Sequence, residues 1–240
     1  MHNHVGVSHN REEADSAEEA VLGVRYSFAA KFLLVSLFAT LLLIGLASTV
    51  HLLKEWETIH QDRKWLYLAS NIASMLFVSL VIATTCFRGK AVRKASGIQP
   101  RISAFLGSFL SLSLMFFPKP ELPQALTVLA LVMMIGGTLL SFCVLLWLGT
   151  SFSIMAEARR LVTNGPYAVV RHPLYACEQI AIFGALILHL SPLAVAVIAL
   201  QFALQFKRMA NEEKVLRQAF PEYAKYAAGV PRLIPFRFPA

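Results

Sequence analysis

One short segment of this 240-residue sequence concentrates side chains that bind ions and donate hydrogen bonds. Within residues 159–178, an Asn-Gly-Pro turn signal at 164–166 precedes Pro173, which suits the first turn of a helix because that turn has no use for the missing N–H. His172 would then cap the helix, with Arg171 beside its free N–H groups. A helix N-terminus carries a partial positive charge and free N–H groups, so it attracts anions, and a neighbouring arginine adds to this attraction. The segment therefore predicts a seat for a carboxylate or a phosphate.

The same residues also have an ordinary explanation. Basic residues are abundant where helices leave a membrane, so Arg171 could contact lipid phosphates while His172 only caps the helix. Glu178 follows less than two turns later and is the only carboxylate inside any of the predicted membrane spans. A carboxylate near a helix N-terminus complements the helix dipole, so a purely structural role is open for Glu178 as well.

A second group of charged residues lies within residues 207–220. Arg208 and Glu212 are four residues apart, the spacing of the weak ion pairs found on solvated helices. Glu212 or Glu213 also shares a helical stripe with apolar residues. Taken alone, this pattern is typical of an exposed cytosolic helix.

The composition indicates the class of protein fold that positions these residues. Hydrophobic residues make up 57% of the chain and charged residues 15%, and the mean hydropathy is +0.60. Soluble domains carry about 25% charged residues, so an integral membrane protein is predicted. The three cysteines form no CxxC pair or zinc-type spacing, no GxG motif occurs, and the net charge of +8 is spread in short stretches rather than over one nucleic-acid-binding face. The sequence thus favours neither a disulfide scaffold, a metal site nor a nucleic-acid partner.

We expect an all-α integral membrane fold with five to six transmembrane helices, a C-terminal helical hairpin and a cytosolic helical cap. The apolar segments are 28–50, 65–87, 102–117, 123–149, 174–190 and 192–206. The last two are short, at 17 and 15 residues, and the sequence leaves open whether the final arm crosses fully. Segment 102–117 contains four serines and is the weakest of the set.

These segments divide the chain into three regions. Residues 1–27 are polar and mildly acidic and predict a flexible cytosolic tail, 28–149 the first four transmembrane helices, and 150–240 a cofactor-binding, catalytic region with the hairpin and cap. Placing the N-terminus in the cytoplasm puts 18 of the 22 Lys and Arg residues inside. The positive-inside rule therefore predicts an inner or plasma membrane protein with both termini cytoplasmic.

The C-terminal motifs resemble one family when they are taken together. Leu161-Val162-Thr163-Asn164-Gly165-Pro166-Tyr167, Arg171-His172-Pro173-Leu174-Tyr175, Glu212-Glu213, and Tyr223-x-x-Tyr226 followed by Val230-Pro231 and Ile234-Pro235 stand in its order and spacing. The chain resembles the isoprenylcysteine carboxyl methyltransferase family, which is grouped with membrane phospholipid N-methyltransferases. The likeness covers about the last ninety residues, roughly the size of a small domain. Cys177 departs from it, because the family usually has glycine there.

The resemblance implies S-adenosylmethionine as cofactor, in a cytoplasm-facing pocket that the C-terminal segment closes. A lipophilic small molecule or lipidated acceptor would enter from the bilayer, among membrane lipids. The implied catalytic residues are Arg171, Arg208 and Glu213. The implied cofactor-binding residues are Leu161, Val162, Gly165, Tyr167, His172, Tyr175, Glu212 and Glu213.

The residue types suit this chemistry. The carboxylate of the cofactor favours Arg, His or a helix N-terminus, and its ammonium and ribose hydroxyls favour carboxylates such as Glu212 or Glu213. Arg171 would orient either that carboxylate or an anionic acceptor, and Lys207 and Arg208 are alternatives for both tasks. A carboxylate acceptor needs no general base, whereas an amine must lose a proton.

Several alternatives are open. The acceptor could be a phospholipid or other amine, or a thiol, with the same cofactor. An NADPH-dependent membrane reductase of the sterol type has a similar C-terminal helical arrangement. A non-catalytic scaffold that has kept the fold is the remaining possibility, and the oligomeric state cannot be read from the sequence.

Overall fold

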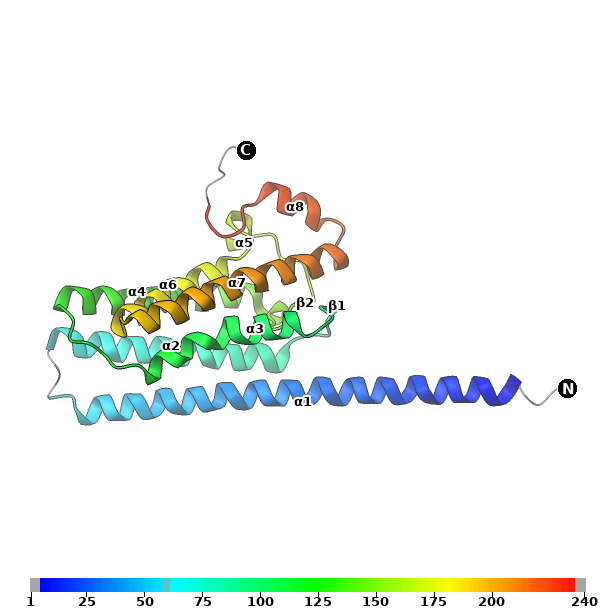
Figure 1. Ribbon diagram of the computed structural model, residues 1–240, viewed down its shortest axis with the longest axis horizontal. Helices are drawn as coiled ribbons and strands as arrows, with labels where there is room; N and C mark the ends of the chain where they lie inside the picture. The colour runs from blue at the N-terminus through cyan, green and yellow to red at the C-terminus, as the bar shows by residue number, and fades with distance from the viewer. Residues whose placement is uncertain (1–4, 58, 60, 236–240) are drawn as a thin grey trace.

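The long apolar segments form a bundle of helices in the computed structural model, which describes residues 5–57, 59 and 61–235 (Figure 1). The elements in chain order are α1 (Val5–Lys54), α2 (Gln61–Phe87), β1 (Arg93–Lys94), α3 (Gln99–Phe109), η1 (Leu110–Phe116), α4 (Gln124–Leu148), η2 (Gly149–Ser151), β2 (Glu157–Ala158), α5 (Pro166–Val169), α6 (Pro173–Leu188), α7 (Pro192–Ala219) and α8 (Tyr223–Gly229). The prediction of an all-α membrane fold is confirmed.

Four helices of the described chain are long and apolar enough to cross a membrane, at Lys31–Lys54, Arg63–Phe87, Gln124–Ser151 and Pro192–Ala219. The final arm, whose full crossing the sequence left open, is long and apolar enough to span a membrane. α7 has 28 residues, because its helical pattern continues past Phe206 into the charged segment, whereas α6 has only 16. The short arm of the pair is therefore α6.

Segment 102–117 is not one regular helix. α3 ends at Phe109 and continues as the 3-10 helix η1. Hydroxyls bond back to the chain here, Ser108 to the carbonyl of Ala104 and Ser113 to that of Leu110. Such bonds compete with regular helical geometry and are common where helices bend or tighten.

α6 and α7 follow one another in the chain, as in the predicted hairpin, but each packs mainly against another helix. α6 lies against α4, and α7 lies against α3. Gly137 and Gly184 permit the first contact, because a Cβ on Gly137 would come within 2.5 Å of the backbone nitrogen of Ala181, and one on Gly184 within 2.5 Å of the carbonyl oxygen of Ala130. Cys177 lies at this interface, since its carbonyl oxygen also approaches Gly137.

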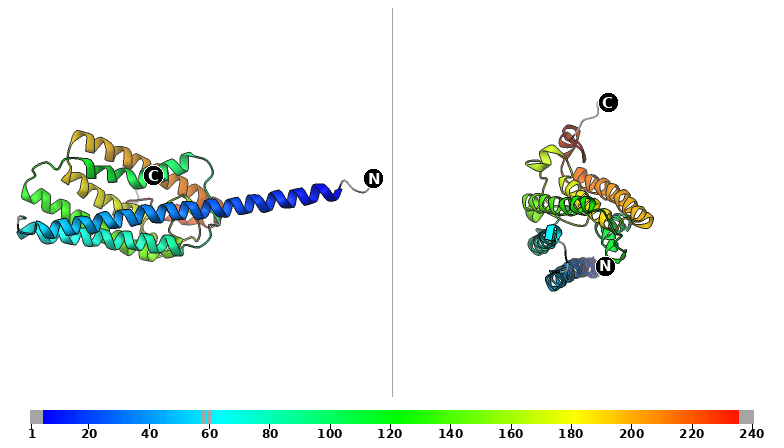
Figure 2. Two further views of the ribbon diagram at one scale, coloured as in Figure 1. Left: turned by 90° about the horizontal axis from the view of Figure 1, so that it is seen from below. Right: turned by 90° about the vertical axis from the view of Figure 1, so that its left-hand side faces the viewer.

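α1 lies at the edge of the bundle and packs against α2 (Figure 2). Its backbone is helical from Val5, so residues 5–27, for which the sequence predicts a flexible tail, extend the helix beyond the other helices (Figure 1). Once a span has nucleated a helix, good helix formers such as Ala and Glu lengthen it at little cost. Residues 1–4 lie outside the described residues, and the boundary at residue 27 stays a prediction.

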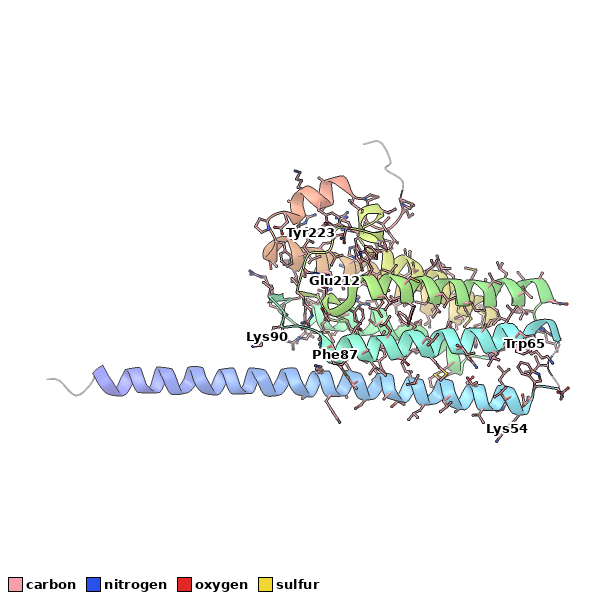
Figure 3. The ribbon with its side chains drawn as sticks, turned by 180° about the vertical axis from the view of Figure 1, so that it is seen from behind. Lys54, Trp65, Phe87, Lys90, Glu212 and Tyr223 are labelled. Carbon is pink, nitrogen blue, oxygen red and sulfur yellow. The ribbon has the colours of Figure 1, made fainter. Side chains whose placement is uncertain are left out.

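The two ends of the bundle differ in chemistry (Figure 3). Lys54 and Trp65 mark one end, while Phe87, Lys90, Glu212 and Tyr223 gather near the other. At this second end a short antiparallel ribbon joins two loops, with Arg93 opposite Ala158 and Lys94 opposite Glu157. The ribbon fixes the loop after η2 beside the basic α2–α3 loop, and both candidate segments of the sequence lie at this end.

Candidate functional site

The turn that precedes the site is fixed by Gly165. Its φ of +59° lies in the left-handed region, and a Cβ there would come within 2.3 Å of the Trp147 ring. The indole Nε1 of Trp147 donates a hydrogen bond of 3.2 Å to Oδ1 of Asn164. The turn is therefore anchored to the end of α4, and Gly165 lies against Trp147 rather than in a cavity wall.

The C-terminal segment pairs with the start of α6. The backbone N–H groups of Arg171 and His172 donate to the carbonyls of Pro231 and Arg232, at 2.8 and 3.0 Å. His172 is the N-cap residue of α6, as expected, and Pro173 occupies its first turn. Residues 231–232 thus close over the helix start, the position that the resemblance implied for a closing segment.

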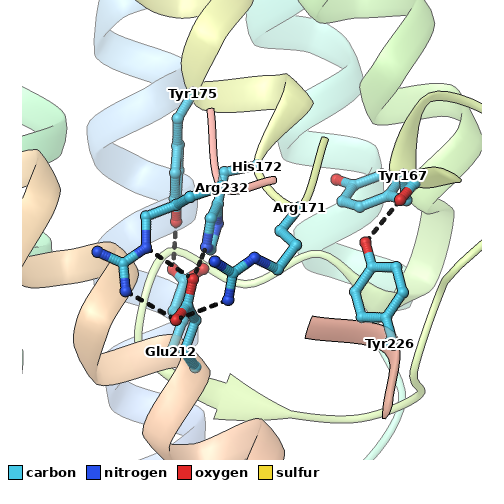
Figure 4. Close-up of polar contacts among 8 residues, drawn as sticks. Tyr167, Arg171, His172, Tyr175, Glu212, Tyr226 and Arg232 are labelled. Atoms are coloured by element: carbon cyan, nitrogen blue, oxygen red, sulfur yellow. Dashed lines mark hydrogen bonds and ion pairs between the residues drawn. The ribbon is translucent and has the colours of Figure 1, made fainter. Parts of the chain in front are cut away.

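Glu213 is the centre of a buried charge cluster, drawn in Figure 4. Its carboxylate accepts two hydrogen bonds from Arg232, at 2.9 and 2.8 Å, and forms an ion pair with Arg171 at 3.1 Å. Nε2 of His172 lies 3.0 Å from Oε1. We call Glu213, Arg171, His172 and Arg232 the cap interface. Two arginines and a histidine satisfy this carboxylate, and it does not line a cavity.

Glu212 has different neighbours. It accepts a hydrogen bond from the hydroxyl of Tyr175 and forms an ion pair with Nε of Arg208 at 3.4 Å. The Arg208 guanidinium lies 4.6 Å from the centre of the Tyr175 ring, a cation–π contact. The Tyr175 ring also stacks on His172, with centroids 5.4 Å apart. We call Tyr175, Arg208 and Glu212 the partition.

Two cavities meet at the partition. The first, the polar cavity, is bordered by seven residues that the sequence implicated, Leu161, Val162, Tyr167, Arg171, His172, Tyr175 and Glu212. Tyr223 and Tyr226 of the C-terminal cap also border it. Gly165, Glu213 and Arg208 do not: Gly165 and Glu213 lie behind the wall, and Arg208 faces the other side of the partition.

The second, the apolar cavity, lies among the membrane helices. Phe38 and Leu41 of α1, Phe77 and Val81 of α2, and residues of α3, η1, α4 and α6 line it. Arg208 and Glu178 supply its charged groups. Phe152 borders both cavities, so the two are separated by little more than the partition and this ring.

Cys177 lines neither cavity. It packs against the apolar core that contains Val144 and Leu174. The substitution of the family's usual glycine therefore falls at the helix interface with α4, where a small side chain is accommodated.

Sequence reasoning missed Arg232 and Trp147. Arg232 lies between the quoted Val230-Pro231 and Ile234-Pro235 dipeptides, and a lone cation held between two such rigid pairs was the available signal. No sequence pattern pointed to Trp147, because its contact with the turn depends on the direction in which α4 ends.

Tyr226 ties the cap to the turn. Its hydroxyl donates a hydrogen bond of 2.6 Å to the carbonyl of Tyr167. Burial, the largest cause, raises the pKa of Tyr226 to about 12. The phenol therefore keeps its proton and stays a donor at neutral pH.

Comparison with known proteins adds independent findings. The model of the isoprenylcysteine carboxyl methyltransferase family matches residues 128–218. A cobalt-zinc-cadmium resistance protein of Cupriavidus metallidurans is 43% identical over 76 residues, 31% of this chain and 35% of that protein. Protein-S-isoprenylcysteine O-methyltransferase B of Arabidopsis thaliana is 31% identical over 130 residues, 51% of this chain and 66% of the relative.

A probable protein-S-isoprenylcysteine O-methyltransferase of Oryza sativa subsp. indica is 30% identical over 129 residues, which are 51% of this chain and 68% of the rice protein. The chain belongs to the isoprenylcysteine carboxyl methyltransferase family. The family match includes the start of α6, the partition and Glu213, and it ends at residue 218, before the cap helix α8. The chain spans only 35% and 38% of the length of two metal-resistance relatives that it matches, so their names say little about the whole protein.

Proposed function

We propose that this family member is an integral membrane methyltransferase that uses S-adenosylmethionine to methylate a carboxylate on a lipophilic acceptor. One observation carries the proposal: a polar cavity and an apolar cavity meet at the partition of Tyr175, Arg208 and Glu212. Such an arrangement lets a water-soluble donor and a membrane-soluble acceptor approach one point from opposite sides. The names of the plant relatives support the same chemistry.

The polar cavity suits the donor by its chemistry. Leu161, Val162 and Leu174 offer an apolar wall for an adenine ring. Arg171 offers a cation for a carboxylate, and Glu212 offers a carboxylate for an ammonium or ribose hydroxyl. The cavity also has Glu157, Arg159 and Arg160 in its lining, so it combines an apolar surface with cations and carboxylates. This combination suits a zwitterionic nucleoside, so these residues would hold the donor.

The chain's residues have three tasks in the transfer. When bound, S-adenosylmethionine supplies a methyl group on a positively charged sulfur. Transfer of that methyl group to a carboxylate oxygen would neutralise one positive and one negative charge. No proton has to be removed, so alignment and exclusion of water supply the rate enhancement. We assign Arg208 to orient the acceptor, Glu212 and Tyr175 to orient the donor side, and the cap interface to keep water out.

The cap interface is a positioning element in this proposal. Glu213 joins α7 to Arg232 of the C-terminal segment and to the start of α6, so it fixes the geometry of both cavity walls. This assigns Glu213 a structural task rather than contact with the reacting atoms. Residues 150–240 would form the catalytic region and residues 28–149 the membrane framework, with α4 and α6 tightly packed across that boundary.

We also propose that the site end of the bundle faces the cytoplasm and that the protein resides in the inner or plasma membrane. Lys90 lies at the Glu212 end in Figure 3, and the basic α2–α3 loop continues there with Arg93 and Lys94. Cytoplasmic loops carry the excess of Lys and Arg, which supports this orientation.

The test is a pair of measurements on the purified full chain in detergent micelles. Calorimetric titration should show saturable binding of S-adenosylmethionine and none of NADPH, and binding of NADPH alone would support a reductase instead. Incubation with methyl-labelled donor and a prenylated cysteine derivative should give label that base releases as methanol, the mark of a carboxyl ester. Stable label would indicate an amine or thiol acceptor, and donor binding without transfer to any acceptor would support the scaffold alternative.

A further inference from the structure

Another cavity lies outside the proposed transfer site, between the α2–α3 loop and the last part of α7. Its volume is about 460 Å³, within the range of small-molecule sites, about 300–1,000 Å³. Residues 93–100 form one wall, and the other is formed by Asn211, Lys214, Val215 and Gln218. Among the described residues that line it, three are cations, Arg93, Lys94 and Lys214, and none is a carboxylate. We call it the basic cavity.

The positive charges of the basic cavity are largely unmatched. Among the ion pairs of the described residues, none involves Arg93 or Lys214. Lys94 lies 3.9 Å from Glu157, but that carboxylate also accepts a hydrogen bond from Arg159. One carboxylate thus serves two cations, and the cavity keeps a surplus of positive charge. It therefore attracts an anion.

The β1–β2 ribbon holds the loop wall of the cavity in place against α7. The N–H of Val92 donates to the carbonyl of Ala158 at 2.7 Å, and that of Ala95 donates to the carbonyl of Ala156 at 2.9 Å. Ala156 and Ala158 also form a buried apolar cluster with Val215 of α7. The two walls are therefore joined before any ligand binds, which lowers the entropy cost of binding.

The basic cavity lies where the helices leave the membrane. The apolar span Arg63–Phe87 ends shortly before the loop wall begins, and Phe87 and Lys90 mark this end of the bundle in Figure 3. Val92 and Ile98 of the loop are large apolar side chains exposed at the surface, Ile98 at 72%. Exposed apolar residues among Arg and Lys are typical of a segment in the interfacial layer, where cations meet lipid head groups. This position favours a lipid head group as the anion.

Positive charge at a membrane boundary also has a topological explanation. The positive-inside rule requires the cations to be on one side of the membrane, but it does not require them to converge on one cavity. Lys90 and Arg101 satisfy the rule while lying outside the cavity lining. Arg93 and Lys214 come from distant parts of the chain and line the same cavity, which topology does not explain.

We propose that the basic cavity binds the phosphate head group of an anionic phospholipid. Arg93, Lys94 and Lys214 would surround the phosphate, and the exposed Ile98 would lie beside the acyl chains. Basic pockets between membrane helices suit such head groups, because each cation near an anionic membrane surface contributes about fivefold to binding. The site is separate from the polar and apolar cavities, so the proposal does not depend on methyl transfer.

The experiment uses the purified full chain in detergent micelles at about 0.15 M ionic strength, where charges more than about 8 Å apart are largely screened. Native mass spectrometry measures the Kd for dioleoylphosphatidylglycerol and for dioleoylphosphatidylcholine, which has the same chains and a head group without net charge. The cavity variant is Arg93→Gln/Lys214→Gln, which leaves the paired Lys94 in place. The control variant, Lys90→Gln/Arg101→Gln, removes the same charge from two exposed residues outside the lining.

We expect wild type to bind the phosphatidylglycerol about 30-fold or more tightly than the phosphatidylcholine. The cavity variant should lose about 30-fold in affinity for the phosphatidylglycerol alone, since two cations are removed. The control variant should lose about threefold or less, because its cations are farther away and screened. Equal melting temperatures without added lipid show that both are folded. If the double variant does not fold, Arg93→Gln and Lys214→Gln should each lose about fivefold.

Equal losses in the cavity and control variants overturn the proposal, since the attraction then belongs to the total charge of this end of the bundle. Equal affinity of wild type for the two lipids overturns it as well. Glycerophosphoglycerol has the same head group without acyl chains, and it should compete at least about tenfold more weakly than the lipid because it buries no methylene groups. Competition as tight as that of the lipid would show a site for a soluble phosphate ester instead.

Discussion

The cap interface and the partition are built from adjacent residues of α7, but they differ in how completely their charges are satisfied. In the cap interface, Glu213 has two arginines and a histidine around it and borders no cavity. In the partition, Glu212 has a tyrosine hydroxyl and one arginine and borders the polar cavity. A closed cluster holds elements together, whereas a carboxylate with free acceptor positions can bind a ligand. We therefore propose a structural role for Glu213 and a ligand-binding role for Glu212.

The largest effect is expected when the closed cluster is opened. Glu213→Ala leaves Arg171 and its partners without a counter-charge, and breaking a buried pair costs about 3–5 kcal/mol. Because the Arg232 side chain is 39% exposed and can turn to water, we expect the lower end of this range. The stability loss should appear as faster hydrogen exchange in α8 and residues 230–235, measured by mass spectrometry. Glu222→Gln, on an exposed carboxylate, is the control. Equal exchange in both variants would contradict the structural role of Glu213.

Glu212→Gln should weaken donor binding and leave the cap stable, which is the opposite of the effect expected for Glu213→Ala. The amide oxygen can still accept from Tyr175 and Arg208, so the loss of stability should be smaller than in Glu213→Ala, but the charge that the proposed donor's ammonium requires is lost. We expect the Kd for S-adenosylmethionine to rise about 10- to 100-fold, the value of a hydrogen bond to a charged group. Calorimetry measures the Kd, and hydrogen exchange of α8 should match wild type. A destabilised cap with normal donor affinity would show that Glu212 has the structural role and does not bind the donor.

Tyr175→Phe tests the partition more finely. It removes the hydroxyl that bonds Glu212 and keeps the ring that contacts His172 and Arg208. We expect a loss of donor affinity of about tenfold, near 1.5 kcal/mol. Tyr175→Leu, which also removes the ring, should lose more, and the difference between the two variants measures the contribution of the cation–π contact. Equal losses would show that the ring contacts contribute nothing.

The smallest effect is expected at the edge of the cap interface. Tyr226→Phe removes the hydrogen bond to the carbonyl of Tyr167, worth about 1 kcal/mol. A small fall in the melting temperature should accompany unchanged Kd for the donor, measured by thermal scanning fluorimetry and calorimetry. A large change in Kd would mean that the cap contacts the donor more directly than the cavity lining indicates.

Much of the fold could be predicted from the sequence because the relevant forces are local. Runs of apolar residues long enough to span a bilayer must be helical, since backbone groups in lipid have to bond within their own segment. The Asn-Gly-Pro turn at 164–166, His172 as cap residue and Pro173 in the first turn followed from local rules and agree with the structure. Seven of the residues that the likeness implicated border one cavity, while their roles stay a prediction.

Other properties depended on which elements lie opposite one another. Successive residues of a helix point about 100° apart, so the neighbours of α7 decided that Glu213 meets Arg171 and Arg232 while Glu212 meets Tyr175. The same holds for Arg208. The sequence analysis placed it with the other site residues, but in the structure it lines the apolar cavity. The sequence alone determined which segments are helical and which residue types are available. Only the tertiary structure decided which charges neutralise one another and which are left for a ligand, because that depends on contacts between residues as far as 41 positions apart.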